Sequence, residues 1–245
     1  MILCIDIGNS NVKCALGTIK TYTTAFFATD KMVCKTDFEN FICESFGPDV
    51  WEKLRGCAIA SVVPSKNEII TQVMIERGIA IKRLDREDCT LNFSRYSSEL
   101  GEDRGICCVA ASVKYPLPLI LIDFGTATTV NVVSCDKIFL GGAIAAGVYT
   151  GLKALMTCTA QLPPISEIAD AKLIGENTNE GLVSGAVIGA ACLVEGYVRR
   201  LTKELGKKPS VVVTGGNADA IIEHLHFEFV YEPGLLLEGL FRMWE

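Results

Sequence analysis

The sequence predicts an α/β protein made of two halves related by duplication. Three observations support this prediction. Each half opens with β-rich runs joined by tight turns, each then alternates between strand and helix patterns, and an Asp-x-Gly turn follows the first strand of both. Antiparallel hairpins followed by strand–helix alternation are typical of mixed sheets with flanking helices. Because two prolines interrupt the pattern at 115–118, we expect domains at 1–115 and 116–245.

The first half contains helices whose N-terminal signals are visible in the sequence. Thr36 and Glu39 match a capping box at the start of one helix, and Ser65 and Glu68 match another. In such a box the side chains satisfy backbone N–H groups that the first turn leaves without partners. The elements expected in this half are strands at 2–6, 11–17, 21–28, 58–63 and 79–84, and helices at 37–46, 65–77 and 103–114.

The second half repeats this order and adds a long helix. Gly181, Gly185 and Gly189 recur every fourth residue along it beside an apolar stripe, which is typical of a core-facing surface. The glycines also permit close approach of another helix. The most apolar stretch, 182–194, is shorter than the roughly 20 residues that span a bilayer, so we expect no membrane segment. The elements expected here are strands at 118–123, 128–134, 137–144 and 210–214, a last short strand, and helices at 148–157, 178–205, 218–225 and from 235.

Charge and cysteine usage narrow the classes of function. The formal net charge of −6 argues against a nucleic-acid binder, because such proteins usually present a basic face. The eleven cysteines include no C-x-x-C pair and lie far from the two histidines, which disfavours a zinc or iron–sulfur site. With no basic leader ahead of the first strand, we expect a cytoplasmic protein with reduced thiols. Several of these thiols lie within apolar runs, namely Cys4, Cys57, Cys107, Cys108 and Cys192.

The first candidate site is the turn that follows the opening strand. A glycine there lets the backbone approach a ligand closely, and successive N–H groups and hydroxyls form a concave anion site. Asp6 at the strand end is placed to organise Mg²⁺, while Lys13 on the returning strand is placed to neutralise charge on a transferred group. A plain β-hairpin using Gly-Asn as turn chemistry is the alternative. The candidate phosphate contacts are Gly8, Asn9, Ser10, Asn11 and Lys13.

The second candidate site is a turn with the same design midway along the chain. Asp123 follows a buried apolar run, and the turn continues through Gly125 and Thr126 into two further threonines. A carboxylate after such a run is costly unless it is paired with a cation or hydrogen-bonded. A threonine-rich hairpin is the alternative. Two such turns facing each other would hold a polyphosphate and its cation, which indicates a nucleotide phosphotransferase.

A third motif is the glycine pair that follows the strand at 210–214. Gly215 and Gly216 stand between this strand and the next expected helix. Bare backbone there lets a flat adenine or a ribose lie close to a helix N-terminus. A tight strand–helix connection is the alternative reading. Because the pair follows both Asp-x-Gly turns, we assign it to the nucleoside.

A fourth motif, Gly101-Glu102-Asp103-Arg104, lies at an expected helix start. As chemistry, Asp103 would accept the proton of a substrate hydroxyl as phosphoryl transfer begins. Arg104 would orient an anionic substrate or hold Asp103 in place. The alternative is a surface acid at a helix N-terminus with its basic partner.

Taken together, these motifs give the chain a nearly end-to-end resemblance to the type III pantothenate kinases, of the actin, hexokinase and heat-shock chaperone ATPase superfamily. The resemblance implies a duplicated ribonuclease H-like (actin-like ATPase) fold. It also implies ATP-dependent phosphorylation of pantothenate to 4'-phosphopantothenate, the first step of coenzyme A synthesis, by a homodimer with its substrate site at the interface. The matching segments, in family order, are 6–11, 101–104, 123–129, 141–145, 159–163, 175–185 and 214–216.

The resemblance also implies roles for single residues. The stretch from Asp6 to Lys13 is expected to face the ATP phosphates, with Mg²⁺ accompanying the nucleotide near Asp6, and Thr126 is expected to contact ATP. Asp123 is expected to bind a monovalent cation, K⁺ or NH₄⁺. Asp103 is the implied proton acceptor. The residues expected to touch pantothenate are Gly101, Glu102, Asp103, Arg104 and Thr178.

Two departures from the family pattern leave alternatives open. Glu102 stands where the family usually carries a small or apolar residue. The family's substrate-contacting tyrosine is not fixed by the segment 92–98, where Tyr96 and Phe93 are both candidates. One rival function is therefore a kinase acting on another small hydroxylated acid or a sugar. The other is a regulator that binds ligand without turnover, against which the intact aspartate set argues.

Overall fold

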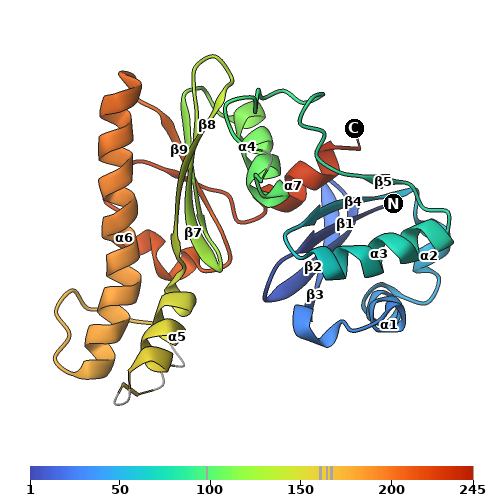
Figure 1. Ribbon diagram of the computed structural model, residues 1–245, viewed down its shortest axis with the longest axis horizontal. Coiled ribbons are helices and arrows are strands. Elements are labelled where there is room, and N and C mark those ends of the chain that lie inside the picture. Colours follow the sequence, from blue (N-terminus) through green and yellow to red (C-terminus); the bar gives the residue numbers. More distant parts are fainter. Residues whose placement is uncertain (98, 160–161, 164, 166–167, 245) are drawn as a thin grey trace. The chain divides into compact units, whose positions relative to one another are not determined.

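The computed structural model describes residues 1–97, 99–159, 162–163, 165 and 168–244 of the chain (Figure 1). Ala160 and Gln161, which belong to one of the family-like motifs, lie outside the described residues. The chain forms two compact units: Met1–Leu91 with Ser97–Val113 and Gly234–Glu245, and Asn92–Tyr96 with Lys114–Pro233. These units differ from the expected halves, 1–115 and 116–245, chiefly because the last segment of the chain belongs to the first unit.

The first unit is built on a five-stranded mixed sheet with the order β3-β2-β1-β4-β5. β1 pairs antiparallel with β2 and parallel with β4, so the end of β1 lies beside the end of β4 at one edge of the sheet. The central strands β1 and β4 are almost continuously apolar, so both of their faces are buried. The strands are β1 (Ile2–Ile7), β2 (Asn11–Thr18), β3 (Thr21–Ala28), β4 (Gly56–Ser61) and β5 (Ile81–Lys82).

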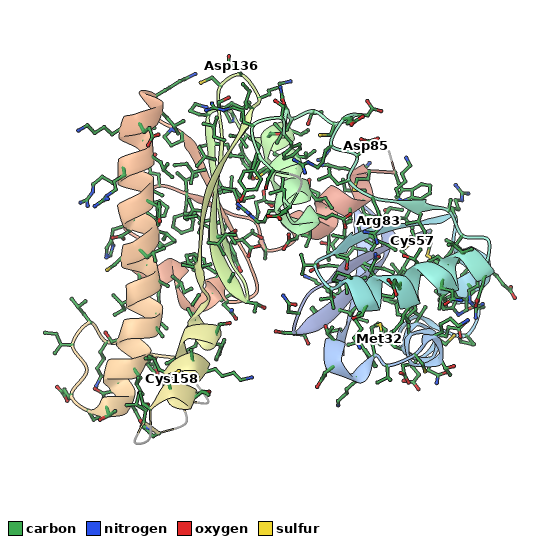
Figure 2. The ribbon with its side chains drawn as sticks, in the orientation of Figure 1. Met32, Cys57, Arg83, Asp85, Asp136 and Cys158 are labelled. Atoms are coloured by element: carbon green, nitrogen blue, oxygen red, sulfur yellow. The ribbon has the colours of Figure 1, made fainter. Side chains whose placement is uncertain are left out.

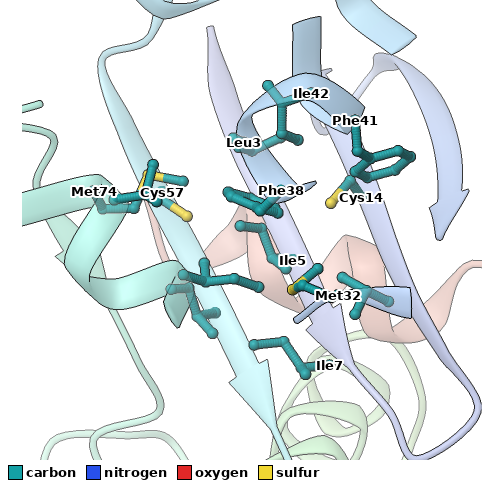
Figure 3. Close-up of a cluster of buried hydrophobic side chains, with 14 of the residues drawn as sticks. Leu3, Ile5, Ile7, Cys14, Met32, Phe38, Phe41, Ile42, Cys57 and Met74 are labelled. Atoms are coloured by element: carbon teal, nitrogen blue, oxygen red, sulfur yellow. The ribbon is translucent and has the colours of Figure 1, made fainter. Parts of the chain in front are cut away.

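Helices cover both faces of this sheet. On one face Leu3, Ile5 and Ile7 of β1 pack beneath apolar side chains of α1 and α3 (Figure 3). On the other face Cys4 and Ala58 pack against α4 and α7. This packing explains why the C-terminal helix joins the first unit. The helices are η1 (Thr29–Lys31), α1 (Lys35–Phe46), α2 (Val50–Lys53), α3 (Pro64–Glu76), α4 (Glu102–Lys114) and α7 (Leu235–Arg242).

The second unit repeats the strand order of the first. Its sheet has the order β8-β7-β6-β9-β10, with antiparallel pairs among the first three strands and parallel pairs among the last three. α6 runs along one face of this sheet (Figure 1) and buries Val187, Ala191 and Val194 there. The elements are β6 (Leu119–Phe124), β7 (Ala127–Val133), β8 (Phe139–Ala146), α5 (Val148–Cys158), α6 (Thr178–Leu205), β9 (Ser210–Thr214), η2 (Ala218–Ala220), η3 (Ile222–His224) and β10 (Val230–Tyr231).

Several local predictions were wrong in detail. α1 is capped by Cys34 with Asp37, two residues before the expected Thr36–Glu39 box. α3 begins at Pro64, so Ser65 lies within its first turn rather than at the N-cap, which is Val63 and makes no side-chain cap hydrogen bond. The helix expected at 218–225 is two short 3₁₀ helices, η2 and η3.

The cysteines and the long helix α6 were also the subject of predictions from the sequence. All eleven cysteines are free, and burial raises the pKa of the Cys108 thiol to about 12, so this thiol behaves as a small apolar group. Cys192, expected inside an apolar run, is exposed on α6. α6 has 28 residues and is long and apolar enough to cross a membrane by length and composition alone. The apolar stretch 182–194 is thus only part of it, although a core helix passes the same test.

Candidate functional site

The first candidate turn is held by backbone hydrogen bonds and by one threonine. The Gly8 N–H donates to the Asn11 carbonyl at 3.0 Å, which closes the turn between β1 and β2. Thr29, which follows β3, also holds the turn. Its hydroxyl donates to the Gly8 carbonyl at 2.7 Å, and its N–H donates to the Ser10 carbonyl at 3.1 Å. Asn9, Ser10 and Asn11 remain exposed. The turn is therefore a fixed loop that presents polar groups outward.

Asp6 and Lys13 lie side by side beneath this turn. They are direct partners in the β1–β2 register, and Lys13 is in turn the partner of Phe26 on β3. The Lys13 ammonium sits 5.4 Å from the centre of the exposed Phe26 ring. Cross-strand partners point to the same face of a sheet. The carboxylate and the ammonium expected to serve phosphate chemistry thus share one face of the first sheet.

The Gly101–Arg104 motif places a carboxylate at the N-terminus of α4. Because Gly101 lacks a side chain, Asp103 Oδ1 occupies the space there: a Cβ on Gly101 would lie only 2.5 Å from that oxygen. The Arg104 N–H donates to Asp103 Oδ1 at 2.7 Å. Burial raises the pKa of the Asp103 carboxyl above its usual range, and the Arg104 N–H and positive charge oppose this shift. A carboxylate with a raised pKa is suited to accept a proton.

The same motif adjoins the strand ends that carry the first turn. The Val62 N–H donates to the Ile7 carbonyl at 3.1 Å, which joins the end of β4 to the end of β1. A Cβ on Gly101 would be 3.6 Å from Val62 Cγ1. The start of α4 therefore packs at the edge of the sheet where the Gly8 turn begins. The expected base, Asp103, and the expected phosphate turn therefore lie at the same end of the first sheet.

Glu102 has partners that the sequence did not indicate. Both of its carboxylate oxygens accept hydrogen bonds from Arg83 Nη1, at 3.0 and 2.8 Å, and one also accepts from the Ser61 N–H at 2.9 Å. Arg83 donates a further hydrogen bond to Asn67 Oδ1 in the first turns of α3. The carboxylate expected to touch substrate is thus engaged by its own unit.

The second candidate turn is built around Asp123 and Gly215. Gly215 has φ of +108°, and a Cβ there would lie 2.5 Å from Asp123 Oδ1 and from the Phe124 backbone. Only glycine fits both that conformation and that space. The two expected site residues are therefore packed against each other, although they are far apart in the sequence. Gly216 next to them is exposed.

Neighbouring segments brace this turn. Asn217 donates from its N–H to the Phe124 carbonyl and from its side-chain amide to the Gly125 carbonyl, both at 2.9 Å. The Thr126 carbonyl accepts from the Gly147 N–H at 3.1 Å and from the Thr150 hydroxyl at 2.7 Å. Thr126 itself is exposed.

The structure separates the two aromatic candidates of the 92–96 segment. Phe93 is buried and packs on Phe139, with ring centres 5.5 Å apart. Tyr96 packs edge-on against the same ring at 5.1 Å but is only partly buried. Tyr96 is therefore the accessible one. Thr178 is exposed as the first residue of α6, directly after the N-cap Asn177.

Each turn carries a single carboxylate, Asp6 in the first and Asp123 in the second. Among the residues that the structure describes, no group of three or more histidine, cysteine or acidic side chains is arranged to hold a metal ion. This donor set fits Mg²⁺ that keeps its waters and is bound through one carboxylate and substrate phosphates. Sequence reasoning missed Thr29, Arg83 and Asn217, because their partners lie 16 or more residues away in the sequence.

Known bacterial proteins match the chain over nearly its whole length. The model of the family described as type III pantothenate kinase matches residues 2–200. A type III pantothenate kinase from Hyphomonas neptunium is 32% identical over 254 residues, covering 100% of this chain and 99% of its own. Relatives with the same name from Brevibacillus brevis and Thermus thermophilus are each 34% identical, and at least 98% of each chain is covered.

Solved structures support the fold. A conserved protein of the Baf transcriptional-activator family from Campylobacter jejuni superposes with a TM-score of 0.59 at 21% identity, covering 98% of this chain and 96% of its own. Component A of (R)-2-hydroxyglutaryl-CoA dehydratase from Acidaminococcus fermentans gives a TM-score of 0.50 at 16% identity, covering 98% and 94%. At these identities the likeness concerns the fold alone, two mixed sheets of five strands with flanking helices.

Proposed function

Because the chain belongs to the type III pantothenate kinase family, we propose that it transfers the γ-phosphoryl group of ATP to the primary hydroxyl of pantothenate. The product is 4'-phosphopantothenate, the first intermediate of coenzyme A synthesis. The observation that carries the proposal is the Asp103 carboxylate, fitted into the space that Gly101 leaves and poised at the strand edge where the Gly8 turn begins.

The nucleotide contacts come from the two Asp-x-Gly turns. Asn9, Ser10 and Asn11 are exposed on the clamped first turn and supply donors to phosphate oxygens, with Gly8 allowing close approach. Lys13 neutralises charge on the γ-phosphoryl group. Mg²⁺, when bound with ATP near Asp6, neutralises further phosphate charge. In the second unit the nucleotide contacts are Thr126, Gly215 and Gly216.

Asp103 acts as the general base. Phosphoryl transfer requires little covalent chemistry from the protein, so positioning and electrostatics dominate. Asp103 aligns the substrate hydroxyl and accepts its proton, a contribution that is typically about 10²–10⁴-fold. We therefore expect Asp103→Asn to lower kcat at least about 10²-fold with ATP binding retained. Turnover near that of the wild type would remove Asp103 from this role.

The remaining contacts orient pantothenate and the cation. Arg104 pairs with the pantothenate carboxylate, and Tyr96 and Thr178 complete the contacts to substrate. Asp123 holds a monovalent cation, K⁺ or NH₄⁺, at the second turn. Asp123→Ala is then expected to abolish stimulation by potassium, and a variant that still responds to potassium would place the cation elsewhere.

A homodimer belongs to the same proposal. Leu173 and Ile174 are 75% and 80% exposed ahead of α6, and Leu193 and Tyr197 are exposed on it. Exposed apolar side chains just ahead of and along the helix that begins with Thr178 favour self-association near a substrate contact. Light scattering after gel filtration is expected to give twice the 26.5 kDa chain mass. Ile174→Asp is expected to shift the protein toward monomer and to reduce pantothenate turnover.

The proposed function is tested by ADP release from MgATP with a panel of acceptors. Pantothenate, other small hydroxy acids and sugars are compared at equal concentration, in potassium and then in sodium buffer. Turnover that depends on pantothenate is expected. Preference for another acceptor would indicate a different small-molecule kinase. Absence of turnover in a folded protein that binds ATP would favour a regulatory role.

A further inference from the structure

We propose that the ion pair between Arg83 and Glu102 positions Asp103, so that Arg83 is a positioning residue for phosphoryl transfer. The inference rests on the proposed function, in which Asp103 is the base. Arg83, labelled in Figure 2, follows β5, and its Nη1 atom binds both oxygens of Glu102, at 3.0 and 2.8 Å. Glu102 is the residue immediately before Asp103 in the first turn of α4.

Asp103 is held by a hydrogen bond from within its own helix. Its carboxylate accepts a hydrogen bond from the N–H of Arg104, its own neighbour in α4. Such a bond fixes Asp103 relative to the helix but does not fix the helix relative to the sheet. The orientation of the base therefore follows that of the first turn of α4. Whatever anchors this turn also sets where the carboxylate points.

Glu102 supplies that anchor through two partners, Ser61 and Arg83. Its carboxylate accepts from the Ser61 N–H at 2.9 Å, at the end of β4 and directly beside Ile7 in the β1–β4 register. Through Arg83 it is also joined to Asn67 near the start of α3. The first turn of α4 is thus tied to the strand ends that carry the phosphate turn and to a neighbouring helix. An acidic side chain at a helix N-terminus is also favoured by the helix dipole.

A second arginine–glutamate pair in the same unit provides a control for ordinary surface pairing. Arg77 also forms two hydrogen bonds to a glutamate, from Nε and Nη2 to Glu39 Oε1 at 3.1 and 2.6 Å. The side chains of this pair are exposed to a similar degree as those of Arg83 and Glu102. Partly exposed pairs of this kind contribute little to stability. The Arg77–Glu39 pair joins α3 to α1 and is remote in sequence from the site motifs. It is therefore a matched control.

The experiment measures kcat and KM for Arg83→Met, Glu102→Gln, their double variant and Glu39→Gln, all well below each melting temperature. Glutamine at 102 keeps the volume and an oxygen for the Ser61 N–H but loses the charge. We expect each single variant at the site to lower kcat about 10-fold, less than the roughly 10²-fold cost of a 1 Å misplacement, with KM for ATP within about twofold. The double variant is expected to be no slower than the slower single one, because the two residues act as a unit. Glu39→Gln is expected to keep wild-type kcat.

Two readouts distinguish positioning from mere structural support. The acid limb of the pH profile of kcat/KM is expected to move to lower pH in the double variant, which removes both charges of the pair, because a displaced Asp103 becomes less buried. Arg83→Lys is expected to recover only part of kcat, since an ammonium lacks the planar guanidinium. Variants with unchanged kcat and an unchanged acid limb beside an active wild type would overturn the positioning role alone. A wild type that phosphorylates no pantothenate would overturn the proposed function and this inference together.

Discussion

Gly101→Ala is the perturbation that addresses the geometry of the base most specifically. The added Cβ would lie 2.5 Å from Asp103 Oδ1, whereas ordinary van der Waals contact begins at 3.4 Å, so the oxygen has to move by the difference, about 0.9 Å. A misplacement of about 1 Å can cost roughly 10²-fold in rate. We therefore expect kcat to fall about 10²-fold. KM for ATP is expected to stay within about twofold, because the first turn is untouched.

Stability is expected to change little in this variant. Gly101 has no positive φ, and the other contact of its Cβ, 3.6 Å to Val62 Cγ1, is an ordinary one. Replacing glycine by alanine at a compatible position also restricts the unfolded chain, which offsets part of any strain. The loss of activity should therefore occur without a matching loss in the melting temperature.

The assay is steady-state ADP release at saturating MgATP, combined with a double-mutant cycle. If Gly101→Ala acts through Asp103, it has little further effect in an Asp103→Asn background, and the two changes are strongly non-additive. Equal fold-losses of kcat in both backgrounds would show that Gly101→Ala does not act through Asp103. So would a Gly101→Ala enzyme with wild-type kcat.

Three further predictions concern the titration of the base and the second turn. Because burial raises the pKa of Asp103, kcat/KM is expected to fall on acidification at a pH above the ordinary aspartate value of 3.8, and an acid limb at that value would contradict the assignment. The same raised pKa means that the stabilising contribution of Asp103 is present at low pH and lost as pH rises through the folded-state pKa, so thermal melts at pH 7 should show Asp103→Asn at least as stable as the wild type. Gly215→Ala, at φ of +108° and 2.5 Å from the Phe124 backbone, is expected to lose about 1–3 kcal/mol of stability and to weaken ATP binding in calorimetry, and an unaffected variant would show that the turn is pliable.

The fold was predictable because both halves show the same order of local strand, turn and helix patterns in the sequence. The strand at 210–214 and the helix at 178–205 appear at their expected bounds, and the hairpins of both halves are within two residues of theirs. The membership of α7 in the first unit was not predictable. Its apolar residues, such as Leu240, indicate burial, but nothing in their spacing tells which sheet they pack on.

The candidate site was predictable where glycine and aspartate stand close in the sequence. The stretch around Asp6 and the Gly101–Asp103 pair carry their geometry within a few residues. Two other features could not be read from neighbouring residues. Arg83 and Glu102 are 19 residues apart in the sequence, and Asp123 and Gly215 are much further apart, so only tertiary packing brings each pair together. Only the folded chain shows that Glu102 is held by Arg83.

The most direct test of the central claim follows the labelled γ-phosphoryl group of ATP into pantothenate, with wild-type and Asp103→Asn proteins side by side. We expect labelled phosphopantothenate from the wild type, formation at least about 10²-fold slower with Asp103→Asn, and equal ATP binding by both proteins. Label transfer at equal rates would contradict the role of Asp103. No transfer by a folded wild type that binds ATP would contradict the proposed reaction itself.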